Sequence, residues 1–457
     1  MTFIYNTLFK VLRVLKNTDS INTQNHIMTS FISLYDYFCK NRTEDVGEYY
    51  AENSAKMTCT LRDFFMTIGH KAPYHLRYTY DVNHPHLLLV HTTDMSDKTN
   101  IVVQECNGLV LDKRTMTIVA MGMVLVQDVA SVDDIPFYTV DGTDIIDEND
   151  MVIEASEDGT VMRVFYHDGV WHVSTNRCID ANRAKWGSDR SFYELLRESI
   201  CGTNGDMTLE DVFEQFMSKT LVYSFILLHP DNHHVILHEN PQVIAVSVRD
   251  KNTFKENKIL SLPFAFAPVT LTRGIVSRLL NGENENNILT KKRGIIVSDM
   301  RDKKHVIRYK VDFPYFRRVE NLRHNMPSMG LSYLAATSDV ERKELGEYFS
   351  SYKSEFTRID RDILNLAKNV HGIYRDAYIR RQYIIDPTED LYSSLQHVHR
   401  EYINSVPKEP MSLQRVLHVL QTRKPHDLHR LLYEKHAGSR SYEVKKIDSS
   451  TQQSSIM

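Results

Sequence analysis

The spacing of apolar residues divides the chain into regions with different expected structures. Apolar side chains recur every three or four positions in residues 1–72 and again in residues 326–446, which predicts helices in both regions. Between residues 73 and 325, short apolar or alternating runs are separated by turn-forming residues, a pattern typical of β-strands. Residues 447–457 are mostly polar and predict a disordered tail. We therefore expect an α+β protein with an antiparallel-sheet core, an N-terminal helical region and an all-α C-terminal domain.

The clearest helical pattern lies in the C-terminal region. Apolar residues separated by alternating steps of four and three keep one face apolar, which predicts a single long helix packed in a bundle. They are Leu345, Phe349, Tyr352, Phe356, Ile359, Ile363, Leu366, Val370 and Ile373. Ser412 is a suitable N-cap for a further helix, which Pro425 should end. A basic, helically spaced segment around Lys10, Arg13 and Lys16 predicts a docked surface helix, with a targeting segment as the alternative.

Composition and charge limit the classes of ligand and location. The formal net charge of −4 gives no overall basic field, so any contact with nucleic acid needs a local basic patch. No apolar run approaches the ~20 residues of a membrane span, so no membrane partner is expected. The five cysteines show no paired spacing, which favours free thiols in a reducing compartment and a cytoplasmic location.

The stretch from Met151 to Tyr166 is the most informative part of the strand region. Two alternating runs flank Asp158-Gly159, a dipeptide typical of tight hairpin turns, so the stretch predicts a β-hairpin. Its importance comes from other segments that follow it in a fixed order along the chain. These are residues 171–178, 223–232, 292–297 and 306–310.

Together these five segments resemble the core motifs of covalent nucleotidyltransferases, and in particular those of phage-type RNA ligases. The resemblance covers roughly residues 100–325 and includes the strand from Gln104 to Leu111, in which Asn107 stands where the family has arginine. Residues 179–192 and 223–230 also resemble a ligase-like group from large DNA viruses, which implies a viral origin. The resemblance implies an ATP-grasp-like ligase core over residues 73–325.

The catalytic positions of these motifs depart from the family pattern. Ser156 stands where the lysine of the family attacks the α-phosphate of ATP, so a lysyl-AMP intermediate cannot form at that position. Ile226 and Arg293 replace the two glutamates related to metal binding, which implies that no metal is held, although Arg293 could take the metal's electrostatic role against a phosphate. The retained motif residues are candidates for binding a nucleotide or phosphate. They are Asp158, Gly159, Arg177, Arg308 and Lys310.

The sequence thus predicts a ligase-like protein that binds RNA or a nucleotide without adenylating itself. Basic and aromatic residues are interleaved through residues 301–323, which suits phosphates and stacked bases. In this span Arg317, Arg318 and Arg323 are the candidate RNA contacts. A solvated strand edge with core aromatics is the other interpretation of the same pattern.

Two other functions stay open. The first is an active RNA ligase that uses ATP and Mg²⁺, with a working lysine elsewhere; Lys291 and Lys292 lie near the fourth motif but lack a following Asp-Gly. The second is a scaffold that binds a protein partner through the C-terminal helices. A histidine cluster near the third motif is interpreted as a polar hairpin tip rather than a zinc site. It consists of His229, His233, His234 and His238.

Overall fold

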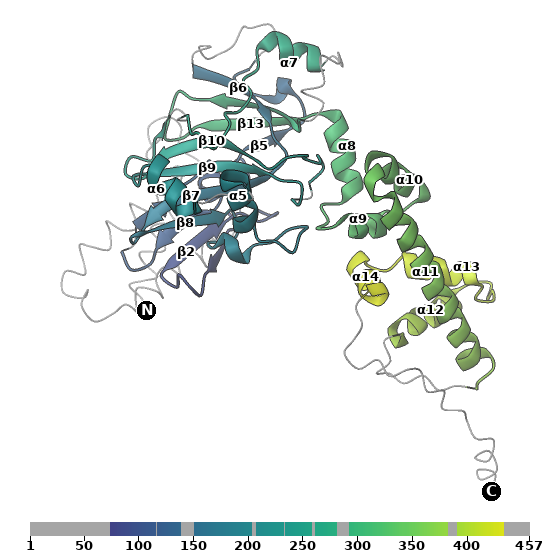
Figure 1. Ribbon diagram of the computed structural model, residues 1–457. Helices are drawn as coiled ribbons and strands as arrows, with labels where there is room; N and C mark the ends of the chain where they lie inside the picture. Colours follow the sequence, from purple (N-terminus) through teal and green to yellow (C-terminus); the bar gives the residue numbers. More distant parts are fainter. Residues whose placement is uncertain are drawn as a thin grey trace, which may run out of the picture. The chain divides into compact units, whose positions relative to one another are not determined.

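The computed structural model describes most of the chain from residue 74 to residue 433, and it divides into two compact units at Phe313/Pro314 (Figure 1). The helices expected in residues 1–72 and the expected tail lie outside the described residues. The described ranges are 74–115, 117–138, 150–202, 207–232, 234–257, 261–280, 292–382 and 391–433. Within them, no helix is long and apolar enough to cross a membrane.

The first sheet of the first unit is antiparallel, in the order β1-β2-β3-β4. Its two faces are both covered, because Leu88 and Leu111 pack around the short helix α4 while Leu87 and Val110 pack against Phe165 of a second sheet. This explains why β2 and β3 are apolar without alternation. The elements are β1 (Arg77–Tyr80), β2 (Leu87–His91), α4 (Ile101–Glu105), β3 (Leu109–Asp112) and β4 (Thr117–Ala120).

The second sheet is also antiparallel, in the order β11-β10-β9-β7-β8. Alternate residues such as Val164, Phe225 and Leu227 point to one face and pack with apolar residues of α5 and α6. Figure 1 shows these two helices beside the strands of this sheet. Ser191 and Thr208 cap these two helices through capping boxes. The elements are β7 (Thr160–His167), β8 (Val170–Thr175), α5 (Phe192–Cys201), α6 (Leu209–Phe216), β9 (Leu221–Leu228), β10 (Gln242–Asp250) and β11 (Glu256–Asn257).

The third sheet has the order β5-β13-β12-β6, with only β5 and β13 parallel. One face is apolar, where Ile153, Ile295 and Val297 pack with Val276 of α7, while the other face carries most of the motif residues. The elements are β5 (Gln127–Val129), β6 (Met151–Ser156), α7 (Arg273–Leu280), β12 (Gly294–Asp299) and β13 (Ile307–Asp312); short 3₁₀ turns occur at Val132–Asp134 and Ala181–Arg183. The expected α+β core with mainly antiparallel strands is therefore confirmed.

The hairpin predicted around Asp158-Gly159 is wrong. β6 pairs with β12 of the third sheet, whereas β7 pairs with β8 and β9 of the second, so residues 157–159 carry the chain from one sheet to the other. Gly159 is needed for packing rather than for a tight turn, since a Cβ there would lie 2.6 Å from Ile226 Cγ2. The Asp158 carboxylate accepts a hydrogen bond from the Ile236 backbone instead of closing a turn.

The described secondary structure of the second unit is entirely helical, as expected. The single long helix predicted from Leu345 onward is in fact two helices, because the backbone of Phe349 leaves the helical region (φ −111°, ψ 57°) while its ring stays buried. Ser412 is the N-cap of α13 as predicted, and Pro425 begins α14 rather than ending α13, a position that suits its missing N–H. The elements are α8 (Pro314–Arg323), α9 (Met329–Ala335), α10 (Asp339–Tyr348), a 3₁₀ turn (Ser350–Tyr352), α11 (Lys353–Tyr374), a π turn (Arg375–Ile379), α12 (Tyr392–Asn404), α13 (Leu413–Gln421) and α14 (Pro425–Tyr433).

We expect the substitution Gly294→Ala to destabilise the first unit by about 2–3 kcal/mol, because it overpacks a strand pair. The added Cβ would lie 2.8 Å from the Asp312 Cα, where only backbone movement could relieve the clash. Gly274→Ala in α7 is the matched control, since nothing lies within 4 Å of its added Cβ, and it should be neutral or stabilising by up to about 1 kcal/mol. Thermal and urea unfolding midpoints measure both effects; equal midpoints for Gly294→Ala and wild type would contradict the packing.

Candidate functional site

The motif residues of the first unit gather where the polar face of the third sheet meets the second sheet. Residues paired directly across strands point to the same face. By this register Ser156 shares a face with Gly294 and Asp312, and Glu154 with Ile296 and Lys310. Arg308 lies on the same face, opposite Ser298. The strand register thus brings together residues that are far apart in sequence.

A small cavity, here called the motif cavity, lies between these two sheets. Ile226 of the second sheet and Arg308 of the third both line it, so the structure unites two of the positions singled out from sequence. Its volume is about 20 Å³, room for no more than one water molecule, whereas ligand pockets usually measure about 300–1,000 Å³. The remaining lining residues are Met123, Glu154, Ala155, Glu157, Ile244, Val246, Pro268 and Ile296.

Three of the motif cations are engaged by carboxylates, and the first of them lies deep inside the unit. Arg308 forms an ion pair with Glu256, which also binds Arg249 at 3.0 Å, and all three side chains are nearly fully buried. Burial alone would raise the pKa of the Glu256 carboxyl, but the two guanidinium groups outweigh it and hold that pKa below its usual value. Glu256 thus shares its one negative charge between two guanidinium groups, and this contact holds the Arg308 side chain inside the protein.

The cations at the outer end of the same sheet face are paired in the same way. Arg293 makes a bidentate contact with Asp312, at 2.9 and 3.0 Å. Lys310 lies 2.8 Å from Asp128 and 3.6 Å from Asp312. Arg293 is thus held beside Lys310 by a shared carboxylate, and its backbone N–H donates to the Ser156 carbonyl at 2.9 Å.

One lysine lies beside the first motif. The Lys292 ammonium forms an ion pair with Glu157, the residue after Ser156, whereas Lys291 lies outside the described residues. Ser156 itself is only 3% exposed, so its hydroxyl is not presented to solvent. Glu154, which also lines the motif cavity, has a raised pKa because burial disfavours its charged form. The first motif therefore combines a buried serine with acidic neighbours and an amine from elsewhere in the chain.

The retained framework residues have structural partners. Asp158 is buried, and its carboxylate accepts a hydrogen bond from the Ile236 N–H at 2.8 Å. The His238 ring contacts the Asp158 carbonyl oxygen at 2.6 Å, which fastens the loop between β9 and β10. Arg177 is exposed and does not line the motif cavity. Its backbone carbonyl accepts a hydrogen bond from the Thr79 hydroxyl of the first sheet. These contacts locate the residues without testing their proposed role toward a phosphate.

The histidines near the third motif have separate surroundings. His229 is 2% exposed, and its ring accepts a hydrogen bond from the Asp231 backbone N–H at 3.0 Å. It is therefore a buried residue and not part of the polar hairpin tip expected from sequence. His234 contacts the Thr160 hydroxyl at 3.2 Å, and His233 lies outside the described residues. The described members of this cluster thus serve to hold the loop after β9.

The arginines proposed for RNA contact lie on α8 of the second unit. Arg318 is exposed and forms an ion pair with Glu344. Arg323 is 5% exposed and donates to the Met326 carbonyl at 3.3 Å, so its guanidinium does not face solvent. Arg317 is partly buried. Their role in RNA binding stays a prediction.

Sequence reasoning missed a buried arginine at the centre of the first unit. Arg163 is 1% exposed, and its Nη2 donates to the Asn107 carbonyl and to Asn176 Oδ1, both at 3.0 Å. A Cβ at Gly108 would lie 2.8 Å from its guanidinium nitrogens, so glycine is required beside it. Burial lowers the pKa of Arg163 to about 10. The backbone carbonyl of Asn107 thus contacts an arginine supplied by β7, a long-range contact that no local motif reveals.

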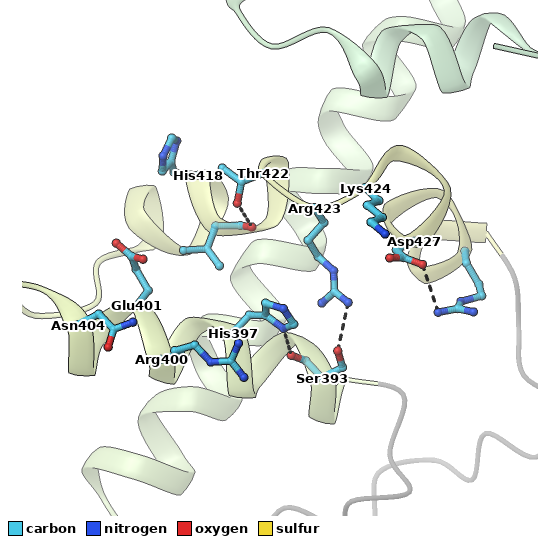
Figure 2. Close-up of a pocket in the computed structure, with 12 residues that line it drawn as sticks. Ser393, His397, Arg400, Glu401, Asn404, His418, Thr422, Arg423, Lys424 and Asp427 are labelled. Atoms are coloured by element: carbon cyan, nitrogen blue, oxygen red, sulfur yellow. Dashed lines mark hydrogen bonds and ion pairs between the residues drawn. The ribbon is translucent and has the colours of Figure 1, made fainter. Parts of the chain in front are cut away.

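The second unit contains a larger polar pocket, here called the basic groove, between α12, α13 and α14 (Figure 2). Its volume of about 550 Å³ falls in the range of ligand sites. Arg423 donates to Ser394 Oγ at 2.8 Å and to Ser393 Oγ at 3.2 Å, and burial lowers its pKa. The lining residues are Ser393, His397, Arg400, Glu401, Asn404, His418, Val419, Thr422, Arg423, Lys424, Asp427 and Arg430.

Positive charge exceeds negative charge in this groove. Its four lysine and arginine side chains face two carboxylates, Glu401 and Asp427. Asp427 lies 3.6 Å from Arg430, and Glu401 lies 3.9 Å from an arginine outside the lining. Within the described residues, the other three cations, Arg400, Arg423 and Lys424, form no ion pair. The groove therefore offers three cations that form no ion pair with the described residues, one on α12 and two in the turn between α13 and α14, and sequence spacing gives no signal for this arrangement.

Comparison with known proteins identifies distant viral homologues. No family model matches the chain. The chain is 23% identical over 287 residues to the "Immediate-early protein ICP-46 homolog" of Invertebrate iridescent virus 3, covering 62% of this chain and 62% of that protein. It is 20% identical over 316 residues to the homologue of the same description from Invertebrate iridescent virus 6, covering 64% of this chain and 69% of that protein. The chain thus matches less than two thirds of the length of the first relative, and the expectation of viral relatives is confirmed.

The structure is also similar to ATP-dependent ligases at low TM-scores. A putative ATP-dependent DNA ligase from Aquifex aeolicus gives a TM-score of 0.34 and 12% identity, covering 75% of this chain and 80% of that one. An archaeal ATP-dependent RNA ligase gives a TM-score of 0.36 and 11% identity, covering 65% and 74% of the two chains. The comparisons therefore relate the chain to viral immediate-early proteins by sequence and to nucleic-acid ligases by partial structural likeness.

Proposed function

We propose that this protein binds single-stranded RNA through the basic groove of its helical unit and does not adenylate itself. The observation that supports this proposal is that the two sites differ in whether their cations form ion pairs with carboxylates of the protein. Around the motif cavity the cations are paired with internal carboxylates, whereas three cations of the basic groove form no ion pair with the described residues. Phosphates bind where positive charge is available and space is open.

The absence of self-adenylation follows from chemistry and space together. A serine at residue 156 could only form an ordinary phosphodiester with AMP, which lacks the labile P–N bond of a lysyl adenylate. Its hydroxyl is buried, and the motif cavity of about 20 Å³ is far smaller than a nucleotide. With Ile226 in the wall and Arg308 held by Glu256, neither volume nor charge favours ATP there.

RNA binding follows from the character of the basic groove. Arg400 and Lys424 are exposed on its rim, where long side chains can follow a flexible phosphate backbone. Arg423 is partly buried, and the hydroxyls of Ser393 and Ser394 orient its planar guanidinium, a group that can bind a phosphate. Figure 2 shows the contact with Ser393. Among polyanions, RNA is favoured because the motifs of the first unit resemble those of RNA ligases.

An active ligase with a relocated nucleophile is the second candidate function. The observation that favours it is the position of Lys292, which reaches Glu157 beside the first motif. To attack ATP, this amine would have to leave Glu157 and lose a proton, and the motif cavity would have to open. An ammonium group engaged by a carboxylate has no lone pair available for attack, so we rank this function second.

We expect no covalent label when the full-length protein is incubated with α-labelled ATP and Mg²⁺, because no lysine occupies the first motif. Denaturing gel electrophoresis followed by autoradiography measures the label, with Lys292→Ala as the companion variant. A labelled wild-type band that disappears in Lys292→Ala would establish the relocated nucleophile and overturn the proposal. A band that persists in the variant would also overturn it and would direct the search to another residue.

We expect charge reversal in the basic groove to weaken RNA binding by on the order of tenfold and to reduce the salt dependence of affinity. The test protein is the double variant with Arg400→Glu and Lys424→Glu. The matched control is the double variant with Arg361→Glu and Lys368→Glu, which makes the same charge change on exposed residues of α11 outside the groove. Fluorescence anisotropy with labelled single-stranded RNA at several salt concentrations gives both quantities. Equal affinities for the two double variants would exclude the groove, and no binding by wild type would favour the scaffold function.

A further inference from the structure

Four side chains that could hold a metal ion converge where the first and second sheets meet. His86 directly precedes β2 of the first sheet, and Asp112 ends β3, where it pairs with Leu87. His167 ends β7, and Asp168 begins the turn to β8 with a left-handed backbone (φ 49°). Their ligand atoms all lie within 4.8 Å of one another. Two strand ends of one sheet and a hairpin turn of another thus supply a compact donor set.

The spacing of these atoms suits four-coordinate zinc. A zinc ion with bonds of about 2.0–2.1 Å in tetrahedral geometry separates its ligand atoms by about 3.3 Å. In the structure, His167 Nε2 lies 3.0 Å from Asp112 Oδ2 and 3.5 Å from Asp168 Oδ1, and His86 Nε2 lies 3.2 Å from Asp168 Oδ2, the other oxygen of that carboxylate. These contacts are close to the tetrahedral spacing, and since the four ligand atoms lie within 4.8 Å of one another, small side-chain rotations would complete the tetrahedron.

Two details show that the cluster is more than an exposed acidic group. The Asp112 side chain is completely buried, and its Oδ1 accepts from the Arg114 backbone N–H at 2.8 Å, which orients Oδ2 toward the histidines. The Nε2 atom of His86 is buried and makes no hydrogen bond of good geometry within the described residues. A buried imidazole nitrogen without a hydrogen-bond partner, facing two carboxylates, is a suitable metal ligand.

The Arg114 side chain now supplies the positive charge of the cluster. Its Nη2 lies 2.7 Å from Asp112 Oδ2 and also forms an ion pair with Asp168. The side chain is 53% exposed, so it can move into solvent without breaking the core. A divalent ion would compensate both carboxylates fully, whereas one guanidinium compensates only half of their charge.

We propose that His86, Asp112, His167 and Asp168 form a structural Zn²⁺ site that fastens the first sheet to the β7–β8 turn. Two imidazoles with two carboxylates favour zinc over Mg²⁺ or Ca²⁺, which prefer oxygen ligands alone. Four protein ligands leave no open position, the arrangement of a structural rather than a catalytic zinc. On binding, His167 Nε2 gives up its hydrogen bond to Asp112, and the ring carries its proton on Nδ1.

The test is metal titration of the full-length protein after removal of any affinity tag and treatment with EDTA. Co²⁺ reports coordination through its visible d–d bands, and Zn²⁺ competition and thermal unfolding report affinity and stabilisation. We expect one equivalent of Co²⁺ with a four-coordinate spectrum and no thiolate charge-transfer band, displacement by Zn²⁺, and a raised melting temperature with Zn²⁺. A featureless spectrum, or a thiolate band, would overturn the proposal.

Variants separate a metal site from a plain ion-pair cluster. His86→Gln and Asp168→Asn should weaken binding more than about tenfold; asparagine tolerates the left-handed backbone of residue 168. His84→Gln is the matched control, because its ring neighbours the cluster but supplies no ligand atom. Arg114→Gln should tighten metal binding, since it removes the competing cation. Weaker or unchanged binding in Arg114→Gln, or equal losses in the His84 variant, would contradict the assignment.

Discussion

The ion pairs of the Glu256 carboxylate are the interaction on which the strand core depends. Glu256 of β11 binds Arg249 of β10 and Arg308 of β13, so one buried carboxylate joins the second sheet to the third. Removing one partner from such a buried group leaves an uncompensated charge and typically costs about 3–5 kcal/mol. Because Arg308 also lines the motif cavity, the contact that joins the two sheets also engages the guanidinium that a phosphate would need.

The same principle separates the basic groove from the motif cavity in a chain with a net charge of −4. In the first unit, carboxylates lie beside the motif cations, as Asp128 and Asp312 do beside Lys310. In the basic groove the carboxylates are fewer than the cations, and serine hydroxyls rather than acids orient Arg423. Ion pairing within the fold therefore determines which cations remain available to a ligand, and the amino-acid composition does not predict it.

The local spacing of apolar residues predicted the helical and strand regions. The features that it did not predict depend on contacts between residues far apart in sequence. The apolar stripe that includes Leu345 and Phe356 predicted the helical unit, but it could not show that the buried Phe349 ends one helix before the next begins. Asp158-Gly159 has the composition of a hairpin turn, yet the pairing of β6 with β12 sends the two strands into different sheets. In the candidate site, the strand register places Ser156, Arg308 and Lys310 on one face of the third sheet, but of the singled-out positions only Ile226 and Arg308 line the motif cavity. The carboxylates that pair with the motif cations come from elements distant in sequence, and the spacing of residues along the chain does not predict such pairs.

Residues 156, 226 and 293 form one consistent arrangement of charge and volume. A carboxylate at residue 293 would stand beside Asp312, and two carboxylates at that distance need either a shared proton or a bound cation between them. Arginine at that position supplies the cation as part of the chain, so the pair is neutral without a metal. Ile226 likewise fills space in the cavity wall that a polar side chain would leave hydrated. The substitution Arg293→Glu alone would therefore place a second carboxylate next to Asp312, while the cavity stayed closed. Nucleotide chemistry at this site would therefore need charge, volume and nucleophile to change together.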